Sequence, residues 1–136
     1  MSIPNFATLL EAAQSQSEPQ RLLLVFATAE LPADASAEEV ARFERGEGGA
    51  LVPAMCVDKT PQEIGDFASL VVESHETGVD WVILFVAAMS GRDGLAPTSE
   101  AASQALQTMV EAVRNGQIDD YLAVDRDGDM VQLARS

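Results

Sequence analysis

An unbroken apolar run at residues 81–89 is the feature that most constrains how this chain can fold. Gly78 lies before the run, and the polar, glycine-rich residues 90–94 follow it. A half-buried strand would alternate polar and apolar residues, whereas a short continuous run rich in β-branched and aromatic residues is typical of a strand covered on both faces. A buried helix is also apolar throughout, but helices are usually longer than this run. Residues 80–89 are therefore predicted to form the central strand of a sheet that has helices on both sides.

Two further segments are predicted to belong to the same sheet. Residues 22–27 repeat the continuous apolar pattern, and we expect them to form a neighbouring parallel strand. Residues 50–57 form a predicted third strand, which Pro53 should place at an edge or give a bulge, because proline has no N–H to donate. Helical segments alternate with these strands. The predicted fold class is therefore α/β, a three-layer sandwich with a mainly parallel sheet.

The chain is predicted to end in an antiparallel β-hairpin. Two short apolar segments, residues 121–124 and 130–133, flank the pair Asp127-Gly128. An Asp-Gly pair suits the two positive-φ positions of a tight hairpin turn.

Two capping boxes mark predicted helix starts. In each, a hydroxyl residue and a glutamate three positions later satisfy free backbone amides. The box at Thr60–Glu63 predicts a long helix before the central strand. The box at Ser36–Glu39 starts a short helix within residues 30–49, where Val40 and Phe43 are the only large apolar side chains. We expect this helix to be exposed to solvent, and its segment to be mobile or to face a partner.

Length and charge limit the possible functions. The 136 residues fit one domain, residues 1–136, and 8 basic against 22 acidic side chains give a formal charge of −14. Such a charge repels phosphate backbones and anionic lipids, so we expect no nucleic-acid or membrane partner. The single cysteine, Cys56, excludes an internal disulfide. The N-terminus lacks the pattern of a signal peptide, so a cytoplasmic location is expected, and no cofactor is predicted.

Three blocks, residues 26–32, 48–61 and 81–92, resemble a family of small uncharacterised proteobacterial proteins of about this length. Some members carry the label "ribonucleotide reductase subunit alpha". The resemblance covers the whole chain and implies no catalytic residue. Ribonucleotide reduction needs a radical-forming cysteine and a further cysteine pair, whereas this chain has only Cys56. We therefore interpret the label as a misnomer.

The strand ends carry the candidate ligand-binding residues. In an open α/β sheet, ligands bind at the carboxyl ends of the strands. Here those ends hold Lys59 and Thr60, then Ser90, Gly91 and Arg92. Lys59, the only lysine, precedes a predicted helix start, where a cation and free amides together favour an anion. In the alternative interpretation, Lys59 is a solvated turn residue and Arg92 pairs with an acidic neighbour.

Other constellations favour structural roles. Cys56 and His75 are the one possible thiol–imidazole pair, but a helix would carry His75 roughly 20 Å along its axis. We expect Cys56 to be a small buried residue and His75 to lie on the surface. Asp125–Asp129 has its glycine in the wrong position for a calcium loop, so a hairpin turn is predicted instead. No catalytic residue and no metal ligand is predicted.

These observations favour a non-catalytic protein-interaction or regulatory domain that binds another protein or itself. A homodimer is expected over a monomer, because two-fold dimers are the commonest soluble oligomers. The alternative is a small-molecule domain or small enzyme that binds an anion, nucleotide or phosphate ester beside Lys59, Thr60, Ser90, Gly91 and Arg92.

Overall fold

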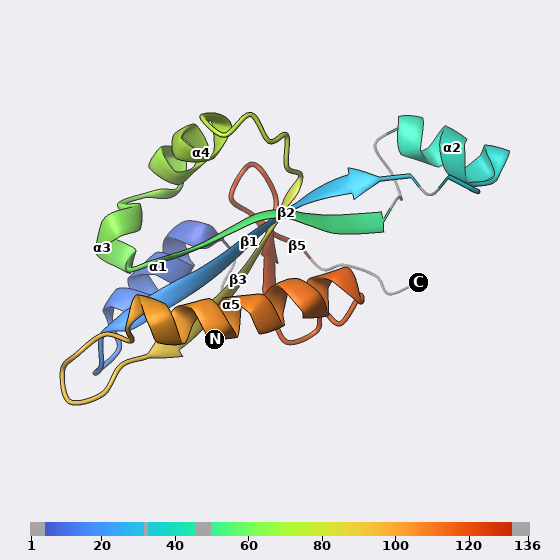
Figure 1. The fold of residues 1–136 in the computed structure, drawn as a ribbon. Helices are drawn as coiled ribbons and strands as arrows, with labels where there is room; N and C mark the ends of the chain where they lie inside the picture. Colours follow the sequence, from blue (N-terminus) through green and yellow to red (C-terminus); the bar gives the residue numbers. More distant parts are fainter. Residues whose placement is uncertain (1–4, 32, 46–49, 132–136) are drawn as a thin grey trace.

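The computed structural model describes residues 5–31, 33–45 and 50–131 (Figure 1). Its helices and strands follow one another in the order α1 (Phe6–Gln14), β1 (Gln20–Glu30), α2 (Ala37–Glu44), β2 (Ala50–Lys59), α3 (Pro61–Ile64), α4 (Phe67–His75), β3 (Ile83–Ser90), α5 (Ser99–Arg114), β4 (Leu122–Val124) and β5 (Met130–Val131).

The five strands form one sheet in the order β2-β1-β3-β4-β5. Every neighbouring pair is antiparallel. Strand β1 pairs along most of its length with β2 on one side and with β3 on the other. β3 is the third of the five strands, so the predicted central position is confirmed for Ile83–Ser90, as is the pairing of this strand with residues 22–27. Residues 80–82, the start of the predicted strand, precede it.

The predicted direction of the strands is wrong. The sheet is antiparallel throughout, and the fold is α+β rather than α/β with a mainly parallel sheet. Helix α2, which would have had to cross over between parallel strands β1 and β2, does not pack on the sheet and has no buried residue. Its two large apolar side chains are too few to cover a sheet face, so β1 and β2 pair as the two arms of a long hairpin.

Strand β2 lies at one edge of the sheet, as Pro53 predicted. The register with β1 shifts next to this proline: Phe26 lies opposite Met55, whereas Ala27 lies opposite Pro53. Ala54 is therefore the extra residue of a bulge. Both expected effects of the proline, the edge position and the bulge, are present.

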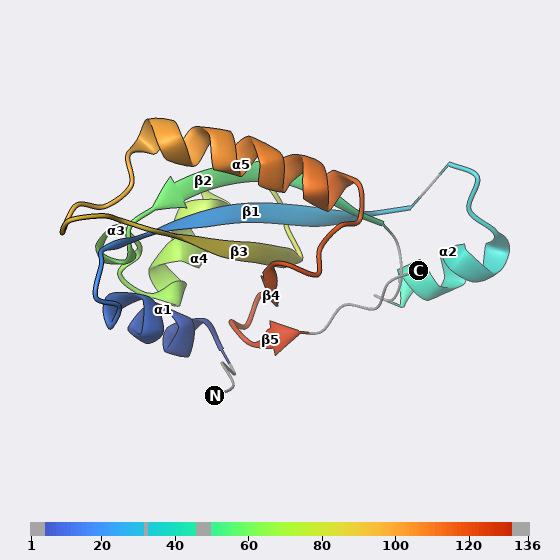
Figure 2. The ribbon, with the colours of Figure 1, turned by 90° about the horizontal axis from the view of Figure 1, so that it is seen from below.

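Two hydrophobic cores cover the two faces of the sheet (Figure 2). The first core packs α1, α3 and α4 on one face, and its members include Phe6, Leu24, Phe26, Ile64, Leu70, Trp81 and Leu84. The second core packs α5 on the other face, with members Leu23, Val25, Phe85, Ala102, Leu106, Met109 and Val113. No helix in the described parts of the chain is long and apolar enough to cross a membrane.

The capping box at Thr60 forms, but the helix it starts is short. Thr60 N–H donates to the Glu63 carboxylate and Glu63 N–H donates to the Thr60 hydroxyl, at 2.9 and 3.2 Å. Helix α3 then ends at Gly65, whose φ of 75° is left-handed, and Asp66 caps α4. The long helix that was expected is thus two helices joined at Gly65.

The predicted C-terminal hairpin is confirmed over the described residues, but its turn differs from the expected type; residues 132 and 133 of the predicted second segment lie outside the described residues. β4 and β5 pair antiparallel, and the Asp125 carboxylate accepts from the backbone N–H groups of Asp127 and Asp129. Of the pair Asp127-Gly128, only Gly128 has a positive φ. The turn therefore lacks the two positive-φ residues that were expected. The turn with two positive-φ residues forms at the other Asp-Gly pair, residues 93–94.

We predict that Phe85→Ala lowers the free energy of unfolding by about 3–5 kcal/mol, since Phe85 is fully buried in the second core. Urea denaturation measures the change. Phe43→Ala, on the exposed helix α2, is the matched control and should lower the free energy of unfolding far less. Equal losses in the two variants would contradict the assignment of the core.

Candidate functional site

The five residues predicted to bind an anion lie at one end of the sheet. Lys59 ends β2 and Ser90 ends β3, and both lie opposite the first residues of β1. They share this end because β2 and β3 are each antiparallel to β1 and therefore run in the same direction. Because β1 lies between the two strands, the five residues do not form one cluster. They form two separate places: Lys59 with Thr60, and residues 90–92.

Acidic side chains already occupy the first place. The Lys59 ammonium pairs with the Glu73 carboxylate at 2.8 Å, and its side chain is only 15% exposed. The Glu63 carboxylate lies at the mouth of α3, where it accepts from Thr60 N–H. This hydrogen bond is the main reason that the pKa of Glu63 lies below its usual value, and Arg21 and Lys59 lower it further. An anion would have to displace these carboxylates.

Arg21 is a cation of this region that the sequence analysis missed. Its Nη1 lies 2.8 Å from Asp58 Oδ2, and its Nε donates to the Pro97 carbonyl at 2.8 Å. Ser99, at the start of α5, donates to the same carboxylate oxygen at 3.4 Å. Arg21 therefore ties β1 to β2 and to the start of α5, which is a structural role.

The second place, residues 90–92, is built for close packing. Gly91 N–H donates to the Pro19 carbonyl at 2.8 Å, and a Cβ on Gly91 would overlap the Leu95 carbonyl oxygen. The Ser90 hydroxyl accepts from Gln20 Nε2 at 3.1 Å. Arg92 is exposed, and within the described residues it has no ion pair. Anion binding at these five residues stays a prediction, which the carboxylates of Asp58, Glu63 and Glu73 oppose.

Cys56 and His75 lie apart on different elements. Cys56 is exposed, so the prediction of a buried thiol is wrong; it faces the α5 side of the sheet on edge strand β2. His75 ends α4, and its Nε2 lies 3.3 Å from Arg126 Nη2. Over the residues that the structure describes, no three His, Cys, Asp or Glu side chains gather as metal ligands.

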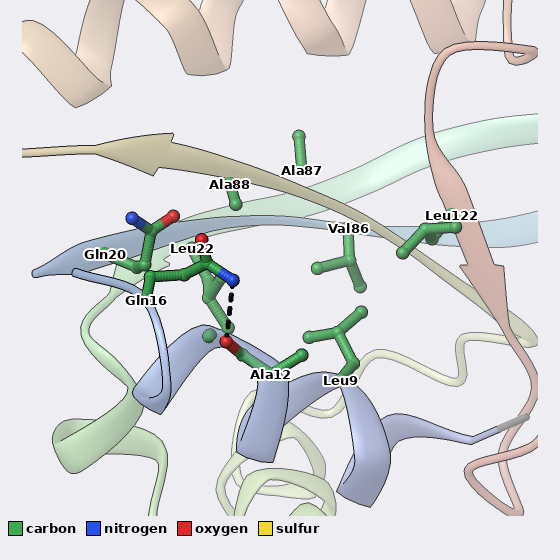
Figure 3. Close-up of a pocket in the computed structure, with 10 residues that line it drawn as sticks. Leu9, Ala12, Gln16, Gln20, Leu22, Val86, Ala87, Ala88 and Leu122 are labelled. Carbon is green, nitrogen blue, oxygen red and sulfur yellow. Dashed lines mark hydrogen bonds between the residues drawn. The ribbon is translucent and has the colours of Figure 1, made fainter. Parts of the chain in front are cut away.

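A groove of about 290 Å³ lies between helix α1 and the sheet (Figure 3). We call it the α1 groove. None of its lining side chains is charged, and they are apolar apart from two glutamines: Leu9, Ala12, Ala13, Gln16, Gln20, Leu22, Val86, Ala87, Ala88 and Leu122. The Gln16 amide donates to the Ala12 carbonyl at 3.0 Å, and the Gln20 amide is held by Ser90. The groove therefore has a preformed apolar floor with amides at one end.

The α1 groove runs beside a part of β3 that has no neighbouring strand on its outer side. β4 pairs only with Leu84, Phe85 and Val86, so residues 87–90 pair with β1 alone among the described strands. We call residues 87–90 the open half of β3. It is open because the chain returning from α5 joins the sheet only at Leu122, whose side chain is 42% exposed at the groove.

The sequence held a weak signal for this groove. Ala87 and Ala88 are the small residues in an otherwise bulky run, and small side chains on a strand leave room above the sheet. Which residues of β3 remain unpaired depends on where β4 begins, and a segment of three residues gives little indication of its register.

Comparison of the chain with family profiles, with curated proteins and with solved structures gives no match.

We predict that Glu63→Gln destabilises the protein at neutral pH but not in acid. Because the pKa of Glu63 is lowered in the folded state, its carboxylate stabilises the fold above the unfolded pKa, and this stabilisation is lost as the pH falls through the folded pKa. The wild type should be more stable at pH 7, by less than about 1 kcal/mol since the side chain is 57% exposed. The difference in free energy of unfolding between the wild type and the variant should become smaller below pH 4.5, the usual pKa of a glutamate carboxyl group.

Urea denaturation over a range of pH values measures this difference. Glu111→Gln, at an exposed position of α5, is the matched control for the loss of one acidic side chain. A constant difference between wild type and Glu63→Gln at every pH would contradict the role of the carboxylate.

Proposed function

We propose that this protein is a non-catalytic protein-interaction domain that binds a segment of a partner protein in the α1 groove. The observation that supports this most directly is the position of the groove, which opens at the open half of β3 (Figure 3). An apolar floor and an unpaired strand edge offer the two kinds of contact that peptide-binding domains use.

The chemistry of the lining supports binding over catalysis. The ten lining residues include no titratable side chain, and the two glutamine side chains are held by hydrogen bonds to neighbouring groups. Such a surface removes apolar side chains from water but offers no group to transfer a proton or attack a substrate. Its volume, near the lower limit for small-molecule pockets, suits one or two side chains of a peptide.

Helix α2 gives the proposal a second support. It lies beyond the sheet, at the far end of the β1–β2 hairpin, and none of its residues is buried (Figure 1). Its first turn carries Glu38 and Glu39. A helix outside the core adds little to the stability of the domain, which favours a role toward a partner.

The test uses a substitution that fills the groove. We predict that Ala12→Phe, which places a ring among the lining residues, abolishes the binding of peptides selected from a random display library on the wild-type protein. Ala7→Phe is the matched control, because Ala7 is exposed on the same helix and does not line the groove. Fluorescence polarisation gives the affinity of each selected peptide for each variant.

Two results would contradict the proposal. Either no sequence is enriched on the wild-type protein, or the enriched peptides bind the Ala12→Phe variant as tightly as the Ala7→Phe variant. Light scattering on the same samples tests the predicted homodimer.

A further inference from the structure

We infer that the partner's segment binds as an added β-strand, antiparallel to β3, and pairs with the main chain of Ala88 and Ser90. We infer further that its side chains alternate between apolar residues, which enter the α1 groove, and lysine or arginine. This inference rests on the proposed function, because it states how the same groove is used and by what kind of partner.

The first step is the direction of the main-chain groups. Gly91 N–H donates to the Pro19 carbonyl, and these two residues continue the register in which Ser90 lies opposite Gln20. In an antiparallel pair, the N–H and C=O of successive residues point alternately toward and away from the partner strand. If residue 91 points toward β1, the main-chain groups of Ala88 and Ser90 point away from it. They face the outer side, where the open half of β3 has no neighbour.

The second step is the match between edge and groove. Side chains of β3 alternate between the two faces of the sheet, and Ala88 and Val86 lie on the face of the α1 groove. In an antiparallel added strand, the residue opposite Ala88 exchanges both hydrogen bonds with it and points its side chain to the same face. That side chain would enter the groove between α1 and β3. One partner residue therefore uses the edge and the groove together.

The third step is the space for such a strand. An added strand would continue the line of β4 beyond Leu122, because β4 occupies the same side of β3 at residues 84–86. Leu122 limits the strand at one end, and the open half of β3 ends at Ser90 at the other. About four residues fit this length, at 3.4 Å per residue.

The fourth step is charge, which decides the occupant. The chain carries a formal charge of −14, and Asp120 lies in the turn just before Leu122, a residue that lines the groove. Two copies of this chain would repel one another at any shared edge, whereas a basic segment is attracted. The groove itself is uncharged, so the basic side chains belong on the opposite face of the added strand.

The experiment uses the full chain and a capped octapeptide of alternating valine and lysine as the probe. Two versions carry N-methyl groups, one on the valines and one on the lysines. A third peptide replaces lysine with glutamate, and a fourth has the same composition in two blocks, four valines then four lysines. Titration calorimetry gives each affinity, and hydrogen exchange gives the protection of individual amides.

The alternating peptide should bind, and its binding should protect the N–H groups of Ala88 and Ser90. Those of Ala87 and Met89 should change little, because they already face β1. Methylation of the valines should weaken binding about tenfold or more, and methylation of the lysines by much less, since only the valine N–H groups would face β3. The glutamate peptide and the block peptide should bind at least about tenfold more weakly, and salt should weaken the alternating peptide.

Two proline variants check the same geometry on the protein. Ala88→Pro removes an outward N–H and should fold while binding the peptide about tenfold more weakly. Ala87→Pro removes an N–H that faces β1 and should unfold the sheet. If Ala88→Pro also fails to fold, the methylated peptides still decide the question.

Each contrary outcome has a distinct meaning. Binding that Ala12→Phe abolishes but valine methylation leaves intact would overturn the added strand and keep the proposed function. Binding that neither change affects would overturn both. If the glutamate peptide binds as tightly as the lysine peptide, or if the lysine peptide does not bind at millimolar concentration, the inference that the partner is basic would be overturned. Self-association that is lost in Ala88→Pro would assign the edge to a second copy and overturn the inference.

Discussion

The burial of β1 on both faces is the constraint on which the rest of this structure depends. Its side chains alternate between two cores: Leu22, Leu24 and Phe26 face α1, α3 and α4, whereas Leu23, Val25 and Ala27 face α5. All six are at most 4% exposed. A strand buried on both faces must have its main-chain groups paired on both edges, because an unpaired buried amide costs as much as a lost hydrogen bond. β2 and β3 supply that pairing. The other elements lie over these three strands or extend the sheet beside β3, except α2, which lies beyond the sheet.

The sequence pattern indicated most of the elements and the buried centres of β1 and β3, but not the direction of the strands. The continuous apolar runs correctly indicated two-sided burial for residues 22–27 and 84–86, but not for the whole of 80–89, where Val82 and Ala88 are exposed. Pro53 correctly indicated an edge with a bulge. Two-sided burial is commonest in parallel sheets, which led to the wrong fold class. The signal against it lay in α2, because a crossover helix needs an apolar face. Part of the inference survives in the segment β2–α3–α4–β3: its two strands run in the same direction, with β1 inserted between them.

The same antiparallel pairing explains which parts of the site were predictable. Lys59 and Ser90 reach one end of the sheet because both of their strands run against β1, so their shared location followed from the strand ends alone. Their partners did not follow. Glu73 reaches Lys59 from α4, a helix whose start at Asp66 depends on the break at Gly65. The open half of β3 beside the α1 groove was less predictable still, because it exists only where β4 is too short to pair with β3.

An exposed strand edge is usually a hazard, because it can pair with another copy of the same chain. Here the open half of β3 is four residues long, and α1 lies beside it, so an incoming strand must also fit the groove. The repulsion between two chains of charge −14 acts against self-pairing at this edge, and Asp120 lies in the turn just before Leu122. Under the proposed function, the charge that keeps copies apart would attract a basic segment. The acidity of the chain and its open edge are therefore compatible with the proposed function, because an edge protected in this way would discriminate between its own copy and an unlike partner.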